Sequence, residues 1–94
     1  MNKLEKENLY KSLIDNYGNK QIVVAIEELS ELQKELCKFL RGKKNSLNLI
    51  EEIADVYIML EQMIIYFNLN ENLIDQEIDI KLIRTKERML KNNA

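Results

Sequence analysis

Apolar residues recur with a helical period along nearly the whole chain. Four such segments are separated by short runs of turn-forming residues. They cover residues 3–16, 20–41, 47–67 and 71–91. Gly18 and Gly42 stop the first two, Asn70 is a plausible cap for the last, and no proline occurs. The pattern predicts an all-α fold, a small antiparallel bundle of four helices, because short connections make consecutive helices antiparallel neighbours.

The segment 47–67 is apolar on nearly every side. Its three apolar faces hold Leu49, Ile53, Leu60 and Ile64; Ala54, Ile58 and Ile65; and Val56, Met59, Met63 and Tyr66. Such a helix is buried all round. A chain of 94 residues buries only about 60–65% of its unfolded surface, which leaves a monomer marginal. We therefore expect a partner subunit to cover one side, in an obligate homo-oligomer.

Two acids begin the third of these apolar faces. Glu52 and Asp55 are spaced i, i+3 and point the same way, below Met59. One interpretation is a frayed first turn, where acids suit the helix dipole and Asn48 with Glu51 forms a capping box. The other is a cation beside the pair, since an unpartnered buried carboxylate is costly.

The segment 20–41 carries a run of glutamates beside its apolar face. We expect that face to hold Ile22, Ile26, Leu29, Gln33, Leu36 and Leu40, widened by Ala25, Leu32 and Phe39. Glu28 borders it, Glu31 and Glu35 lie on the flank, and Glu27 lies further round. A solvated face with i, i+4 pairing is one interpretation. It fits poorly, because Glu27–Glu31 and Glu31–Glu35 are like-charge pairs that each cost a few tenths of a kcal/mol, roughly.

An antiparallel hairpin of these two helices brings the acids together. Glu28 and Glu31 then face Glu52 and Asp55. Two charges about 4 Å apart repel by roughly 4 kcal/mol at an effective dielectric near 20, whereas a domain is stable by only about 5–15 kcal/mol. The cluster therefore requires protonation or bound cations, and an all-carboxylate site suits Mg²⁺ or Mn²⁺, ions that commonly hold phosphates.

Composition excludes several classes of site and partner. The net charge of −2 offers no footprint for nucleic acid. Without histidine, Ser-His-Asp and Cys-His catalysis and histidine zinc sites are excluded. Cys37 has no disulfide partner, no apolar run is long enough to span a membrane, and the charged start lacks the core of a signal peptide. We expect a single cytoplasmic domain over residues 1–94.

The two acid groups form a pattern known from one enzyme family. Glu27-Glu28-Leu29-Ser30-Glu31, followed after twenty residues by Glu52-Ile53-Ala54-Asp55, resembles the Glu-Glu-x-x-Glu and Glu-x-x-Asp motifs of the MazG-like, all-α nucleoside triphosphate pyrophosphohydrolases. The resemblance extends over about residues 13–90. It also takes in Tyr17-Gly18 with Gln21, Phe39-Leu40-Arg41-Gly42, and Lys81-Leu82-Ile83-Arg84 with Arg88.

The resemblance implies a definite chemistry. Members of that family are helical bundles that assemble as dimers or dimers of dimers, and they use Mg²⁺ to hydrolyse nucleoside triphosphates to the monophosphate and pyrophosphate. By motif position the metal ligands would be Glu28, Glu31, Glu52 and Asp55, and the acids acting on water Glu27 and Glu28. The substrate-binding candidates are Gln21, Lys38, Lys81 and Arg84.

Base recognition and the class of protein stay open at this point. Aromatic and amide side chains that would meet a base are Tyr17, Gln21, Tyr57, Tyr66 and Phe67, although aromatic residues on helices are more often core. The rival hypothesis is a non-catalytic helical oligomerisation or regulatory module, in which the acids face solvent. A third possibility is a family member that binds nucleotide or metal without turnover. The presence of all four expected metal ligands argues against it.

Overall fold

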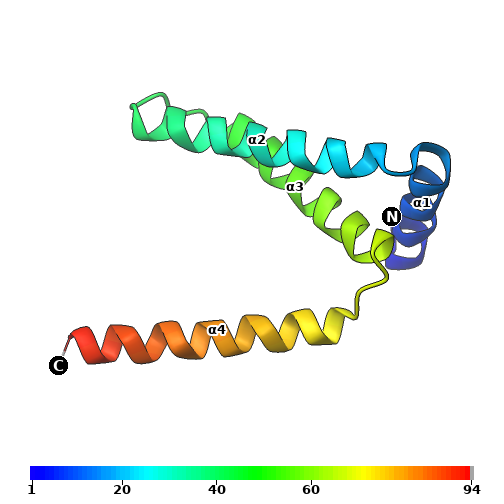
Figure 1. Cartoon of the computed structure of the whole chain (residues 1–94). Helices are drawn as coiled ribbons and strands as arrows, with labels where there is room; N and C mark the ends of the chain where they lie inside the picture. Colours follow the sequence, from blue (N-terminus) through cyan, green and yellow to red (C-terminus); the bar gives the residue numbers. More distant parts are fainter. Residues whose placement is uncertain (94) are drawn as a thin grey trace.

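The computed structural model describes residues 1–93, and all regular structure within them is helical. The helices are α1 (Lys3–Tyr17), α2 (Lys20–Leu40), α3 (Ser46–Tyr66) and α4 (Glu71–Asn92) (Figure 1). The all-α class and the four helices are confirmed, with every helix end within one residue of the sequence pattern. Over the same residues, none of the helices is both long and apolar enough to cross a membrane.

Local polar contacts explain why the helix ends were predictable. Gly18 stops α1 with a φ of 55°, and the Asn70 side chain caps α4. The capping box of Asn48 and Glu51, one of the two interpretations of the acid pair, is not formed, because the cap of α3 is Asn45. The helix begins a turn earlier, where the Asn45 side chain accepts a hydrogen bond from the Asn48 backbone N–H at 3.2 Å. The turns of α3 that carry Glu51, Glu52 and Asp55 therefore lie inside the helix.

Helices α2 and α3 form an antiparallel hairpin, and α1 lies across its open end (Figure 1). The seam of the hairpin is a row of little-exposed positions on each helix that recur three and four residues apart. These positions are Gln21, Ala25, Glu28, Leu32 and Glu35 on α2, and Leu49, Glu52, Val56, Met59 and Met63 on α3. The carboxylates of Glu28 and Glu52 are thus part of the contact between the helices.

Only one edge of the apolar face expected for α2, at Ala25 and Leu32, meets α3. Ile26, Leu29 and Leu36 are 58%, 49% and 49% exposed. Apolar residues cover a wide arc of α2, and only one strip of that arc can face α3. The strip that does so includes Ala25, whose small side chain lets two helix backbones approach closely. The seam is therefore rotated toward Glu28.

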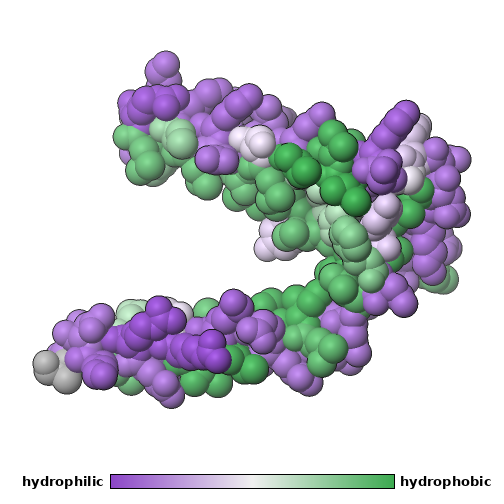
Figure 2. Space-filling model, in the orientation of Figure 1, coloured by the Kyte–Doolittle hydropathy of each residue, from purple (hydrophilic) through white to green (hydrophobic). Residues whose placement is uncertain are grey.

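The remaining apolar side chains gather on one side of the hairpin, which we call the outer apolar face. It consists of Ile26, Leu29, Leu36, Ile53, Tyr57 and Leu60, all between 40% and 65% exposed. These residues are rotated in the same sense from the seam on both helices, which places them on one side of an antiparallel pair. Figure 2 shows this surface turned toward the open space between the hairpin and α4.

The opposite side of the hairpin, the acidic face, carries Glu27, Glu31, Glu51 and Asp55. Its members lie on the other side of the seam from the outer apolar face. The central helix α3 is consequently not buried all round within one chain. Only Val56, Met59 and Gln62 are buried on it.

Helix α4 stands apart from the other three (Figure 1). Its direction is set by the junction after α3. Asn68 has a φ of 52°, the Leu69 N–H donates to the Ile64 carbonyl at 2.9 Å, and the Asn68 N–H donates to the Ile65 carbonyl at 3.1 Å. Three helices pack together and the fourth does not, so the expected four-helix bundle is not closed within a single chain.

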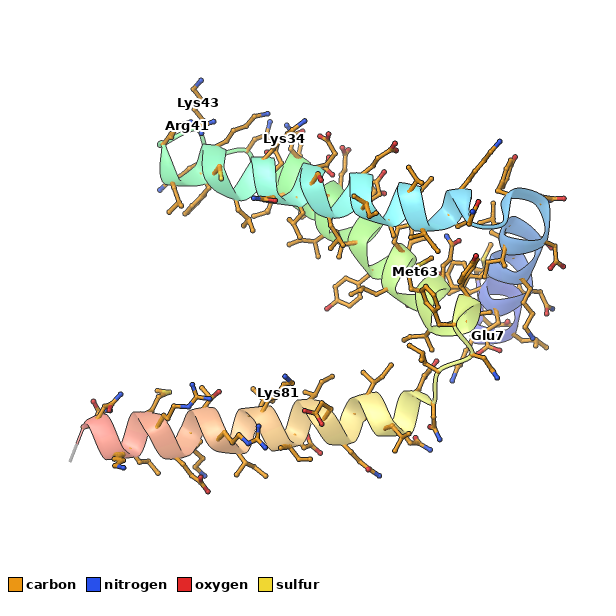
Figure 3. The ribbon with its side chains drawn as sticks, in the orientation of Figure 1. Glu7, Lys34, Arg41, Lys43, Met63 and Lys81 are labelled. Atoms are coloured by element: carbon orange, nitrogen blue, oxygen red, sulfur yellow. The ribbon has the colours of Figure 1, made fainter. Side chains whose placement is uncertain are left out.

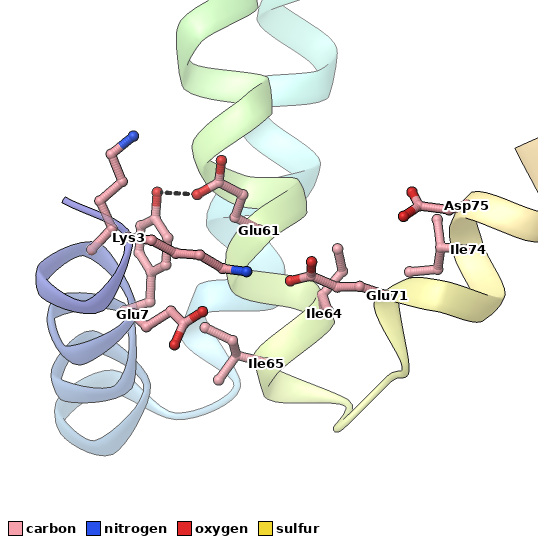
Figure 4. Close-up of a pocket in the computed structure, with 10 residues that line it drawn as sticks. Lys3, Glu7, Glu61, Ile64, Ile65, Glu71, Ile74 and Asp75 are labelled. Atoms are coloured by element: carbon pink, nitrogen blue, oxygen red, sulfur yellow. Dashed lines mark hydrogen bonds between the residues drawn. The ribbon is translucent and has the colours of Figure 1, made fainter.

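Helix α1 is anchored by one buried tyrosine. The Tyr10 hydroxyl donates to the Glu61 carboxylate at 2.7 Å, and the residue is 7% exposed. Burial, together with the hydrogen bond and charge of Glu61, raises the pKa of Tyr10 to about 12. Beside this contact, a cavity of about 310 Å³ lies between α1, the end of α3 and the start of α4 (Figure 4).

Candidate metal centre

Three carboxylates meet in the middle of the hairpin. Glu28 comes from α2, and Glu52 and Asp55 come from α3. One oxygen from each lies within 4.8 Å of the other two. The prediction that the two acid motifs face each other is confirmed for these three residues, which we call the acid trio. Carboxylate oxygens at this separation are close enough to share one hard cation.

The surroundings of the acid trio disfavour negative charge. Partial removal from water raises the pKa of Glu28, and the charge of Asp55, a hydrogen bond to it, and the charges of Glu52 and Glu31 raise it further. Removal from water also raises the pKa of Glu52, followed by the charges of Asp55, Glu31 and Glu35. Every one of these influences favours the protonated acid or the arrival of a cation.

The residues present fit a bound divalent cation. The Oε2 atom of Glu52 is buried and has no hydrogen-bond partner, although a buried carboxylate oxygen ordinarily has one. None of the ion pairs found over residues 1–93 involves a member of the acid trio. An oxygen-only donor set without histidine or thiolate matches Mg²⁺ or Mn²⁺.

Glu31 and Glu27 lie at the margin of the acid trio. Glu31 was expected to be a fourth ligand, but its side chain is 51% exposed and pairs with Lys34 at 3.2 Å. It stands outside the close group because its carboxylate turns toward Lys34 on its own helix rather than across the seam. Glu27 is exposed on the acidic face.

Glu35 belongs to the surroundings of the site, and the sequence interpretation missed this role. Its side chain is only 12% exposed and pairs with Lys38 at 3.1 Å. Its charge contributes to the raised pKa of Glu52. Glu35 follows Glu28 by seven residues, one heptad along the same helix, and this spacing could have placed both side chains on the same stripe. Lys38, expected to bind phosphate, is therefore already engaged beside the acid trio.

The other candidate substrate residues do not reach the acid trio within one chain. Lys81 and Arg84 are exposed on α4, which lies apart from the hairpin (Figure 3). The Lys81 ammonium is 4.0 Å from Glu77 on its own helix. Gln21 is 7% exposed and occupies the seam two helical turns before Glu28, so it fills the contact between helices.

The aromatic candidates are also placed away from the acid trio. Tyr17 and Tyr57 are 53% and 65% exposed. Tyr57 lies on the outer apolar face, on the other side of the hairpin from the acidic face. Tyr66 and Phe67 pack edge to face, with ring centroids 4.9 Å apart, at the far end of α3. Within one chain, none of the four forms a base pocket with the acids.

Comparisons with known proteins provide no further assignment. No protein-family model, no curated protein and no solved structure matches the chain. Any function must accordingly be argued from the positions and chemistry of the residues themselves, and from the resemblance of the two acid motifs.

Proposed function

We propose that this protein is a Mg²⁺-dependent hydrolase that splits nucleoside triphosphates into the monophosphate and pyrophosphate. The observation that carries the proposal is the acid trio. Its three carboxylates come from both acid motifs, approach within 4.8 Å, and include a buried oxygen with no partner. Phosphates bound through Mg²⁺ are the ligand class that such a site serves most often.

The roles of the residues follow from their positions. Glu28, Glu52 and Asp55 would hold the metal, and Glu31 lies close enough to add negative charge at its edge. A bound Mg²⁺ would neutralise phosphate charge and lower the pKa of water. Glu27, exposed on the acidic face, is the candidate to orient the attacking water and accept its proton.

The proposed reaction needs no covalent intermediate with the protein. A water oxygen forms a bond to the α-phosphorus, the bond from that phosphorus to the oxygen bridging the β-phosphate breaks, and pyrophosphate leaves. The water proton passes to a carboxylate. The chain, which contains no histidine, offers carboxylates for this proton transfer.

The test is pyrophosphate release from a panel of canonical nucleoside and deoxynucleoside triphosphates, with and without Mg²⁺. We expect metal-dependent release from some of them. Glu52→Ala or Asp55→Ala should reduce it by about a hundredfold or more, because each removes a metal ligand. The metal-free melting temperature should be unchanged or higher, because one of the crowded charges is gone.

Glu51→Ala is the matched control, since Glu51 is a neighbouring exposed acid outside the trio. It should retain activity and the response to Mg²⁺. Full turnover by both Glu52→Ala and Asp55→Ala would show that the site assignment is wrong.

The second candidate function is a non-catalytic oligomerisation module, and the exposed outer apolar face is the observation that favours it. In that case the hairpin serves as a subunit interface and the acids are incidental. This alternative predicts no change in melting temperature on adding Mg²⁺ or Mn²⁺, and no pyrophosphate release by the wild-type protein.

A further inference from the structure

The end of the hairpin opposite α1 differs in charge from the rest of the chain. We call residues 36–50, which end α2, form the loop and begin α3, the hairpin tip. It contains four Lys or Arg and neither Asp nor Glu, in a chain whose net charge is −2. The cations are Lys38, Arg41, Lys43 and Lys44, and Figure 3 shows Arg41 and Lys43 at this end of the hairpin. In the described part of the chain, only Lys38 among them takes part in an ion pair.

The hairpin tip also exposes apolar side chains among these cations. Leu40 is 84% exposed, Leu47 73% and Ile50 63%. With Met1, Leu40 and Leu47 are the most exposed large apolar residues of the described chain. Phe39 is half exposed, and the Lys44 ammonium lies 5.3 Å from its ring centroid. Figure 2 shows apolar and hydrophilic surface side by side at this end of the hairpin.

Backbone hydrogen bonds fix the turn that carries these side chains. The Lys43 N–H donates to the Lys38 carbonyl and the Gly42 N–H donates to the Phe39 carbonyl, both at 3.0 Å, and Gly42 has a φ of 83°. This pair of bonds is a common way to end an α-helix. The Asn45 side chain then caps α3. The cations and the apolar side chains are consequently presented together by an ordered turn.

The mixture of cations and exposed apolar side chains favours a lipid surface over other anionic partners. A nucleic acid offers phosphates to Lys and Arg, but it would leave Leu40 and Leu47 in water. An anionic bilayer accepts both kinds of side chain. Its headgroups attract Lys and Arg, and its interface takes up apolar side chains to a depth of about 5–10 Å.

The acids of the hairpin lie far enough away to permit such contact. Glu28 of the acid trio precedes Leu40 by twelve residues, which is about 18 Å along α2. This exceeds the Debye length, about 8 Å at physiological ionic strength. The acids nearest the hairpin tip are Glu35, which is paired with Lys38, and Glu51. Repulsion between an anionic surface and the acid trio is therefore screened.

We propose that the hairpin tip binds the surface of anionic lipid bilayers without crossing them. Leu40 and Leu47 enter the headgroup region, and Arg41, Lys43 and Lys44 lie against the anionic headgroups. The acid trio stays in water above the surface. The inference goes beyond the proposed function and does not depend on it, because no residue of the acid trio belongs to the contact.

Cosedimentation of the full chain with lipid vesicles tests the proposal. One set of vesicles contains phosphatidylcholine alone, and the other contains equal parts of phosphatidylcholine and phosphatidylserine. We expect binding to the second set only, and weaker binding as the salt concentration rises. A protein that stays in the supernatant with phosphatidylserine vesicles at low salt would overturn the proposal, whether or not it releases pyrophosphate.

Removing two cations from the hairpin tip shows whether the contact is there. Lys43→Gln with Lys44→Gln should weaken binding about twentyfold or more, since each Lys near an anionic surface contributes about fivefold. The matched control is Lys86→Gln with Lys91→Gln, which removes the same charge from α4. It should bind nearly as well as the wild type. Equal weakening by the two pairs would mean that the contact is not at the hairpin tip.

Removing two apolar side chains shows whether the bilayer itself is recognised. Leu40→Ser with Leu47→Ser should weaken binding to phosphatidylserine vesicles about tenfold or more, with the same salt dependence. Both positions are exposed, so the circular dichroism spectrum should match that of the wild type. Undiminished binding by this variant, or equally tight binding of the wild type to a short DNA duplex, would show a surface for polyanions in general and refute the proposal.

Discussion

The seam of the hairpin carries carboxylates and an amide among its apolar residues, whereas its outer apolar face is exposed. The seam includes Glu28, Glu52 and the 7% exposed Gln21. The outer apolar face exposes residues such as Leu29 and Leu60 to water. Burial of apolar area is the main stabilising contribution to folding. The seam therefore gives up stability to hold carboxylates together, and the exposed apolar side chains of the outer face contribute little to folding within one chain.

Placing a charge on the outer apolar face gives the largest effect expected from this comparison. In an assembly that covers the outer apolar face, Leu29→Asp or Leu60→Asp should separate the subunits and lower the free energy of unfolding by about 3 kcal/mol or more, because the new carboxylate would be buried unpaired. Light scattering would report the mass, and thermal unfolding the stability.

A carboxylate introduced elsewhere on the hairpin provides the control. Asn48→Asp adds a carboxylate at an exposed position near the acidic face and should shift stability by no more than about 0.5 kcal/mol. If Leu29→Asp changes the mass and the stability no more than Asn48→Asp does, the outer apolar face is exposed to water in solution.

A substitution in the seam tests whether its acids are paired with a cation or merely crowded. Glu28→Gln should reduce pyrophosphate release by at least about tenfold more than Glu31→Gln, because only Glu28 belongs to the acid trio. Equal effects of the two substitutions would place the metal between Glu28 and Glu31 rather than across the seam.

The metal-free protein should also depend on pH through Glu28. Its pKa is raised above the ordinary value of 4.5 in the folded state, so the folded form binds the proton more tightly than the unfolded form. The resulting stability is present below that ordinary value and is lost as the pH rises through the raised pKa. Thermal unfolding in chelator from acidic to neutral pH should show this loss, and Glu28→Gln should weaken it.

The smallest expected effect concerns α1, which is held by an ordinary buried contact. Tyr10→Phe should lower the free energy of unfolding by about 1 kcal/mol, since it removes one hydrogen bond to Glu61. The pKa of Tyr10 is raised from 10.0 to about 12, so the stability linked to its proton is present below pH 10 and is lost as the pH approaches 12. Alkaline unfolding that is identical in Tyr10→Phe would contradict this linkage.

Sequence reasoning was most accurate where structure depends on neighbouring residues. The ends of the four helices follow from Gly18, Asn70 and the helical period. The meeting of Glu28 with Glu52 and Asp55 also followed, because a short loop leaves two helices little choice but an antiparallel hairpin. The same reasoning did not identify which part of the α2 face meets α3, since only its edge at Ala25 and Leu32 does so. Apolar residues cover a wide arc of α2, and only contact between side chains of particular sizes selects the strip that faces α3.

The sequence by itself determined the four helices, their ends and the two acid motifs, since these depend on contacts within a few residues. Only the tertiary structure decided which stripe of α2 became the seam, that Glu31 stays outside the acid trio while Glu35 lies close to it, and that α4 leaves the hairpin. Those outcomes depend on the rotation of one helix against another and on the hydrogen bonds of Asn68 and Leu69. Neither is encoded in a local pattern of hydrophobicity.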